Sequence, residues 1–325
     1  MNSIVDLSPT DYVNRLMDLR IPDYQGYTGG QVSLNSYMCA NGSFGGNKNA
    51  SQLYAVMKKV AKGKDEAALM NDPEFSRVFS GQGSMGNTIA AMTVVNRLQA
   101  DFRKEPSLGK YFQKQDFLQA MVDDKCFGQD CIGFVGTYLA ESGVLPAYPG
   151  LYPIDYTRYF TPIKSFADLH DWEPAVVMKA DGQHIQIIDW VADRSGSAIK
   201  VWLCPSSSGT AKGPQSNYPV TIRSGGGDYL DIAKFRAAKG QNAYQKEWAD
   251  DNATRATQGK TARGYEGFLR AMFTTPGTQF GYLGGALFNI VGDGKDQPNP
   301  VAGSVYIGTL KGPSGLQIRA RIGWI

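Results

Sequence analysis

The chain has few histidines, few cysteines and little net charge, and each shortage narrows what the protein can do. Its 325 residues include two histidines and four cysteines, and no two cysteines form a C-x2-C pair. Because zinc sites draw on four such ligands at characteristic spacings, we expect no metal site and no other cofactor. Basic residues number 33 and acidic residues 30, and the basic ones are scattered. This balance argues against nucleic acid as the main ligand.

Long apolar runs are also missing. The longest, such as Thr88 to Val95 and Phe280 to Val291, fall short of the ~20 residues that a membrane-spanning helix needs, so we expect no membrane span. The first twenty residues carry Asp6 and Asp11 and lack the apolar core of a secretory signal. We therefore expect a protein that is cytoplasmic at synthesis, and any action in the cell envelope or periplasm would require a specialised secretion system.

The patterning changes near residue 127. Before it, apolar residues recur at helical spacing over 10–20, 50–63, 85–105 and 114–127. After it, segments rich in Val, Ile and Trp predict an antiparallel meander over 174–180, 183–192 and 198–204, with two more strands near the C-terminus. The sequence thus predicts an α+β fold, with a helical N-terminal region over 1–114 and a second domain over 115–325. The unclear stretch 225–300 is expected to be an insertion in that domain.

The segment "FGQDCIGFVGTYLAESG", residues 127–143, carries the strongest chemical signal. Asp130 is a good N-cap, Cys131 then lies in the first helical turn, and Gly143 ends the helix. The helix dipole favours a thiolate at that position. Gly133 and Gly136 would let another backbone or a substrate approach this end of the helix closely. Cys131 is therefore the candidate nucleophile, against the simpler interpretation of a small buried residue.

A cysteine nucleophile needs a base, and only two histidines are candidates. His184 opens the strand HIQIIDW, whereas His170 lies in a loop between acidic residues, so His184 is preferred. A turn centred on Ser195 would place His184 opposite Ser206, with Cys204 as its diagonal neighbour, and either could orient the imidazole. The backbone N–H of Cys131 and the side chain of Gln129 are the expected oxyanion donors.

The segment DCIGFVGTYL, residues 130–139, resembles the D-C-S-G-F/L-V motif of the NlpC/P60 peptidases, members of the papain-like superfamily. The resemblance covers about 115–217 and implies a papain-like core in which a Cys-bearing helix packs on an antiparallel sheet. It also implies cleavage of peptide bonds in peptidoglycan stems, with Cys131 and His184 as the catalytic pair. The family's serine after the cysteine is Ile132 here. Its third polar residue, His, Asn or Gln, is absent from VWLCPSSSG, which leaves Ser206 or Cys204 in that role.

Two rival interpretations stay open. The same Cys/His pair serves toxin relatives of the superfamily in glutamine deamidation or acyl transfer on proteins, and an inhibitory (immunity) protein would accompany such a toxin. A non-catalytic binding module of the same fold would explain the missing third residue. The segment GQGSMG, residues 81–86, matches G-x-G-x-x-G, but no strand is predicted before it, so it is interpreted as a helix-entry loop and not as a dinucleotide site.

Overall fold

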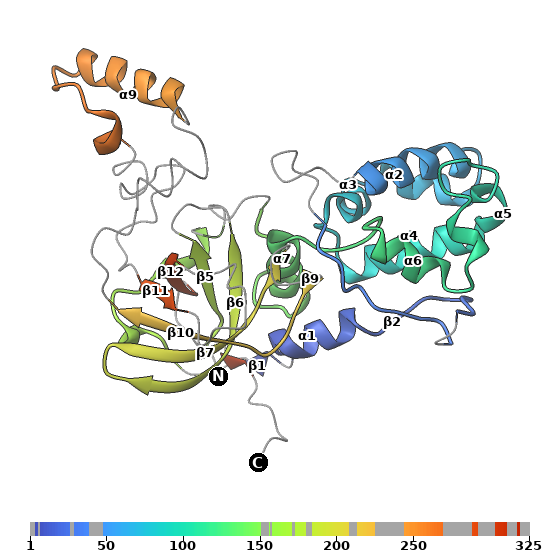
Figure 1. Cartoon of the computed structure of the whole chain (residues 1–325), viewed down its shortest axis with the longest axis horizontal. Coiled ribbons are helices and arrows are strands. Elements are labelled where there is room, and N and C mark those ends of the chain that lie inside the picture. Colours follow the sequence, from blue (N-terminus) through green and yellow to red (C-terminus); the bar gives the residue numbers. More distant parts are fainter. Residues whose placement is uncertain are drawn as a thin grey trace.

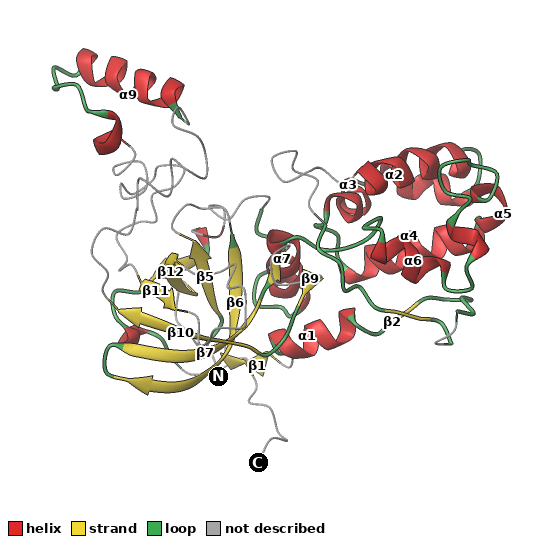
Figure 2. Ribbon diagram, in the orientation of Figure 1, coloured by secondary structure: helices red, strands yellow, loops and turns green. Residues whose placement is uncertain are grey.

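The computed structural model describes most of the chain. The described residues are 4–5, 7–26, 29–38, 48–150, 156, 158–170, 173–179, 184–207, 213–224, 244–268, 288–291, 303–310 and 317–318. Among them, helices and antiparallel strands occupy different parts of the molecule (Figure 2), so the predicted α+β class is confirmed.

Most of the described helices precede the strands of the main sheet in the chain, as the apolar spacing predicted. They are α1 (Pro9–Leu16), α2 (Lys48–Ala61), α3 (Pro73–Ser76), α4 (Met85–Arg97), α5 (Gln99–Phe102), α6 (Phe117–Asp123), α7 (Cys131–Glu141) and α9 (Gln245–Thr257). Short 3-10 turns join them: η2 (Asp65–Asn71), η3 (Arg77–Ser80), η4 (Tyr111–Gln113) and η6 (Phe166–Asp168). None of the helices in the described residues is long and apolar enough to cross a membrane.

The strands are mostly short and lie largely in the second half of the chain. They are β1 (Ile4–Val5), β2 (Leu19–Arg20), β3 (Gln31–Val32), β4 (Phe160–Pro162), β5 (Ala175–Lys179), β6 (Ile185–Ser195), β7 (Ala198–Cys204), β8 (Ser206–Ser207), β9 (Gly213–Pro214), β10 (Tyr218–Ser224), β11 (Phe288–Val291), β12 (Gly303–Leu310) and β13 (Gln317–Ile318). The predicted meander is confirmed as β5, β6 and β7, and the segment GSVYIGTL is β12.

The main sheet closes on itself. Its hydrogen-bonded neighbours run in the order β11, β10, β7, β6, β5, β12 and β4, and β12 also pairs with β11. The ring from β11 to β12 is therefore a six-stranded antiparallel barrel, with β4 added beside β12. Strands with alternating apolar residues can bury one face inside such a ring and the other against helices, because successive side chains point to opposite faces.

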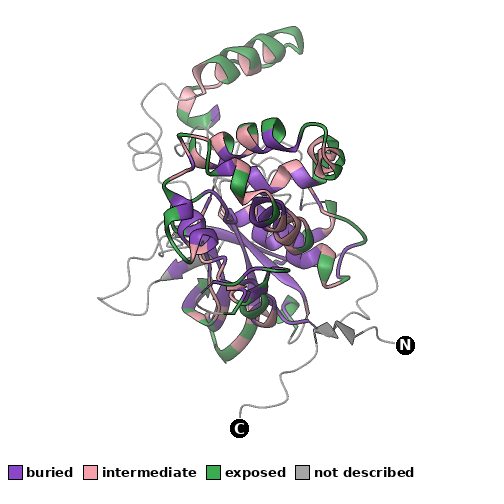
Figure 3. Ribbon diagram, turned by 90° about the vertical axis from the view of Figure 1, so that its right-hand side faces the viewer, coloured by how far each residue is buried: buried purple, intermediate pink, exposed green. Residues whose placement is uncertain are grey.

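Two separate apolar cores result. The barrel interior holds aliphatic side chains from each of its strands, together with Ile163 and Leu169 from the segment after β4. The second core lies between the outer face of β5, β6 and β12 and the helices, and it includes Phe134, Tyr138, Ile185 and Ile187. Figure 3 shows that buried residues extend through the centre of the molecule. In Figure 1, α7 lies between the barrel and the helices of the N-terminal region.

The predicted regions 1–114 and 115–325 share this second core. Residues of α1, α2 and α4 belong to it together with α7 and the barrel's outer face. Thr10 in α1 donates its N–H to the Asp189 carboxylate of β6 over 3.1 Å, and β1 pairs with β13. The helical N-terminal region is therefore attached to the barrel through α1.

The expected insertion over 225–300 is corrected at its C-terminal end. Residues 288–291 form β11, which pairs with both β10 and β12 and completes the barrel. The apolar sequence FNIV is part of the barrel and not of an added module, because Ile290 contributes to the interior core. The described helix within 225–300, α9, has no buried residue. Most of the amphipathic segment predicted over 228–248 lies outside the described residues.

Candidate functional site

The helix that carries Cys131 begins as the sequence predicted. Asp130 is the N-cap of α7 in extended conformation, and its carboxylate accepts a hydrogen bond from the N–H of Gly133. Cys131 is the first helical residue, and Gly143 follows the C-terminal end of the helix with φ of +75°. The thiol-bearing residue is 4% exposed. Its position at the positive end of the helix dipole is therefore confirmed.

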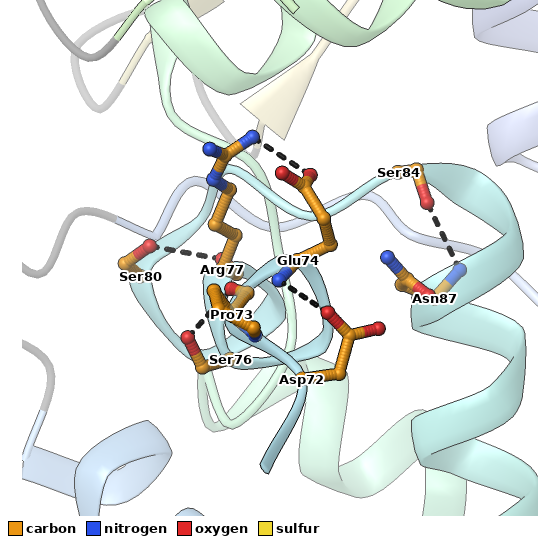
Figure 4. Close-up of polar contacts among 8 residues, drawn as sticks. All are labelled: Asp72, Pro73, Glu74, Ser76, Arg77, Ser80, Ser84 and Asn87. Atoms are coloured by element: carbon orange, nitrogen blue, oxygen red, sulfur yellow. Dashed lines mark hydrogen bonds and ion pairs between the residues drawn. The ribbon is translucent and has the colours of Figure 1, made fainter. Parts of the chain in front are cut away.

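A glycine loop holds this helix start in place. The carbonyl of Gly81 accepts a 2.9 Å hydrogen bond from the Asp130 N–H. It also lies against Gly133, where any Cβ atom would overlap that oxygen. The close backbone approach expected at Gly133 is confirmed. The segment GQGSMG is a helix-entry loop, as predicted, because Ser84 caps α4 by accepting from the Asn87 N–H (Figure 4).

The second glycine of the helix faces aromatic rings. A Cβ on Gly136 would lie 2.5 Å from the Tyr148 ring and 2.7 Å from the Tyr156 hydroxyl. The Arg77 guanidinium lies 4.9 Å from the centre of the Tyr148 ring and pairs with Glu74 over 2.7 Å (Figure 4). The charges of Asp130 and Cys131 both act on Tyr148, whose pKa is raised chiefly by burial.

Tyr148 is a site residue that sequence reasoning missed. Its hydroxyl oxygen is buried and has no hydrogen-bond partner among the described residues, and it lies in the electrostatic neighbourhood of Cys131. The residue sits between Pro146 and Pro149 in a connector that follows α7. No periodicity or motif singles it out there, because its placement depends on how the connector folds back over Gly136.

Gln129 does not take the expected oxyanion role in this arrangement. The side chain is fully buried, and its Nε2 donates to the Gly83 carbonyl over 3.1 Å and to Thr137 Oγ1 over 3.4 Å. Both N–H bonds of the amide are thereby used inside the protein. Its backbone is equally committed, because the N–H donates to the Ser36 carbonyl and the carbonyl accepts from Met38. Gln129 positions the segment that leads into Cys131.

The predicted register between His184 and Ser206 is wrong. Ile187 pairs with Cys204 and Ile188 with Leu203, and two irregularities further along β6 and β7 shift the register. Ser206 instead pairs with Pro214 in the small β8–β9 sheet, and its Oγ donates to the Gln129 carbonyl over 2.8 Å. The error begins at the turn, which lies at Gly196 and Ser197 and not at Ser195, because Ser195 pairs with Ala198. The two irregularities shorten this offset but leave the register one residue away from the predicted one.

Cys204 lies on the face of the sheet that α1 and α7 cover. It is fully buried, its Sγ lies 3.6 Å from Thr10 Oγ1, and it shares a core with Ile185 and Ile187. By strand alternation His184 and Gln186 belong to the opposite face. Cys204 is therefore not a same-face neighbour of His184 and does not orient its imidazole.

His184 immediately precedes β6 and joins the ladder through its carbonyl, which accepts from the Lys179 N–H over 2.9 Å. The residue is partly exposed, but its Nε2 is buried and makes no hydrogen bond to any described residue. Burial, and then the charge of Lys179, lowers the pKa of the imidazole to about 3. The imidazole is therefore neutral at pH 7, and its Nε2 is not hydrogen-bonded to Cys131.

His170 lies at the other end of β6. It is exposed, as expected, and lines a pocket of about 420 Å³ with Phe166 and Arg194 beside the β6–β7 turn. Arg194 donates to the carbonyls of Phe166 and Leu169, which holds η6 against this turn. His170 is thus far along the barrel from the start of α7.

No cluster of His, Cys, Asp or Glu in the described part of the chain could hold a metal ion. Comparison of the chain with protein-family models, with curated proteins and with solved structures gives no match.

The close contact at Gly133 yields a stability prediction. We expect Gly133→Ala to lower the free energy of unfolding by about 1–3 kcal/mol or more, because the new methyl group would overlap the Gly81 carbonyl and force backbone movement. Gly86→Ala is the matched control, since Gly86 is an exposed position in α4 where a Cβ would meet no described atom within 4 Å. That variant should be neutral or gain up to about 1 kcal/mol. Urea denaturation measures the free energy of unfolding of both variants. An equal change in Gly133→Ala and Gly86→Ala would contradict the close contact at Gly133.

The N-cap carboxylate yields a pH prediction. Burial raises the pKa of Asp130 from 3.8 to about 7, so the folded protein retains a proton there that the unfolded chain releases. Stability from this group is therefore lost as pH rises from about 4 to 7, with a slope of up to about 1.4 kcal/mol per unit. Asn caps helices as well as Asp does, so Asp130→Asn should remove this slope and keep the fold. Urea denaturation at several pH values tests it; parallel profiles for the two proteins would contradict the raised pKa.

Proposed function

We propose that the protein is a papain-like cysteine hydrolase that cleaves an amide bond, with Cys131 as nucleophile. The observation that carries the proposal is the placement of Cys131 as the first residue of α7, capped by Asp130, on a helix that packs against the strand that His184 precedes. The motif resemblance suggests the stem peptides of peptidoglycan as substrate. Such an enzyme would act outside the cytoplasm, after export, and an inhibitory partner would protect a producing cell.

In this mechanism the Cys131 sulfur attacks the amide carbonyl carbon and the thiol proton passes to His184, which then protonates the leaving amine. The neutral imidazole has a free nitrogen to accept that proton, but the burial that lowers its pKa to about 3 makes it a weak base, so it has to leave its resting position before it can take the proton. The Gly133 N–H is occupied by Asp130, which leaves the Cys131 N–H as the expected oxyanion donor at the helix start. Water then hydrolyses the thioester and regenerates the thiol.

The mechanism requires a rearrangement. His184 lies on the face of β6 opposite to α7, so its ring has to turn toward Cys131 when substrate binds. The residue lies just outside β6, and its Nε2 has no hydrogen bond to a described residue that would oppose the turn. The resting protein therefore lacks a thiolate–imidazolium pair through this nitrogen.

A binding module of the same fold is the second candidate. The observation that favours it is the lack of a hydrogen bond from His184 Nε2 to Cys131 in the described structure, together with the use of Gln129 and Ser206 as internal structural groups. A deamidase would form the same kind of thioester with ammonia as the leaving group, and an acyltransferase would pass the acyl group to an acceptor other than water.

The geometry of the protein without substrate predicts that the Cys131 thiol reacts slowly with alkylating reagents. We expect Cys131 to react with iodoacetamide at pH 7 at a rate no higher than that of an ordinary cysteine, because the residue is only 4% exposed and the resting His184 is neutral. Mass spectrometry of peptides from the native protein, taken over time, measures alkylation at each cysteine separately. Cys126 is the internal reference, since burial raises its pKa to about 11. Rapid alkylation at pH 6 that His184→Ala abolishes would show a preformed pair instead.

The decisive experiment is digestion of purified peptidoglycan sacculi, with released muropeptides identified by mass. Wild type and Cys126→Ala should release the same fragments, whereas Cys131→Ala and His184→Ala should release none. The masses would name the bond. Equal release by wild type and Cys131→Ala would remove Cys131 as nucleophile. Inactivity of wild type together with retained binding to sacculi would favour the binding module.

A further inference from the structure

Among the described residues, the barrel interior contains an amide side chain surrounded by aliphatic ones. Gln186 alternates with Ile185 and Ile187, which face α7, so it points into the barrel, beside its cross-strand partner Val177. The next strand contributes Ile307 to the same row. Gln186 is fully buried, and neither its Oε1 nor its Nε2 has a hydrogen-bond partner in the described structure.

His184 belongs to the same face, one step closer to the end of the barrel. It lies beside Lys179, which pairs with Val305 of β12. Its Nε2 is buried without a partner among the described residues, while the residue as a whole is partly exposed. Among the described residues, this end of the barrel therefore carries three buried polar atoms without hydrogen bonds, two of Gln186 and one of His184.

Such an arrangement is costly for the protein alone. A buried amide that makes no hydrogen bond loses its hydration without compensation, and an aliphatic side chain of similar size would avoid that loss. Buried polar groups without partners call for a specific explanation, and the mouths of β-barrels are common ligand sites.

We propose that this end of the barrel binds a small ligand bearing a peptide-type amide, held by Gln186 and His184. A carboxamide offers one acceptor and two donors in a plane, which matches the N–H and C=O of a secondary amide. The neutral imidazole adds one further hydrogen bond nearer the surface. The site does not depend on Cys131 as nucleophile, because α7 covers the other face of β6.

Stability without ligand gives the first test. Gln186→Leu should raise the urea midpoint of unfolding, since it removes two unsatisfied polar atoms at similar volume. Ile188→Leu on the same face is the control and should leave the midpoint unchanged or lower it slightly. A lowered midpoint for Gln186→Leu would overturn the proposal, because it would mean that the amide already has internal partners.

Ligand binding gives the second test. The probe is N-acetylalanine N′-methylamide, titrated into ¹⁵N-labelled protein while the Gln186 side-chain NH₂ signal is followed by NMR. We expect the signal to shift in wild type and in Cys131→Ala, and binding to be lost in Gln186→Leu and weakened in His184→Ala. The corresponding methyl ester, which lacks one N–H, should bind about tenfold more weakly.

Three results would overturn the proposal. They are no shift at tens of millimolar probe, equal binding of amide and ester, or contacts of the Gln186 NH₂ with ordered water only. Inactivity of the wild type on sacculi with intact probe binding would instead reject the hydrolase and retain this site.

Discussion

The arrangement around Cys131 depends on one close backbone contact, between the carbonyl of Gly81 and the first turn of α7. That oxygen accepts the Asp130 N–H and occupies the space that a side chain at residue 133 would need. Without the contact, the N-cap, the thiol and the segment containing Gln129 would lose their common support. The contact also gives the loop GQGSMG, which resembles a dinucleotide-binding motif, a structural role. The carbonyl of its first glycine, Gly81, holds the start of α7 in place.

Two ionisable groups, one at the helix start and one at the barrel end, act on stability in opposite directions. Asp130 has a raised pKa, so its contribution favours the folded state as pH falls from 7 toward 4. His184 has a lowered pKa, so below about pH 6.5 the unfolded chain binds a proton there and the folded protein does not. Its contribution therefore disfavours the folded state as pH falls. Each group is neutral in the fold at mildly acidic pH, and the two slopes oppose each other there. The barrel end and the helix start therefore respond differently to the same change in pH.

The closed barrel changes how the candidate catalytic pair is understood. In an open sheet, a histidine at the start of the central strand has one face toward the helix and one toward solvent. Here the second face is the interior of a ring, and His184 shares it with Gln186. The thiol and the imidazole thus lie on the two sides of β6. Catalysis through both requires movement of the imidazole.

The sequence by itself determined the local features of the protein: the N-cap at Asp130, the first-turn position of Cys131, the glycine approach at Gly133 and the strands of the meander. Each depends on residues within a few positions of one another, through capping, spacing and alternation. Only the tertiary structure decided the register of β6 and β7, the use of 288–291 to close the barrel, and the position of Tyr148. These features depend on bulges and on contacts between residues far apart in the chain. The spacing of apolar residues, every two in a strand or every 3.6 in a helix, predicts neither.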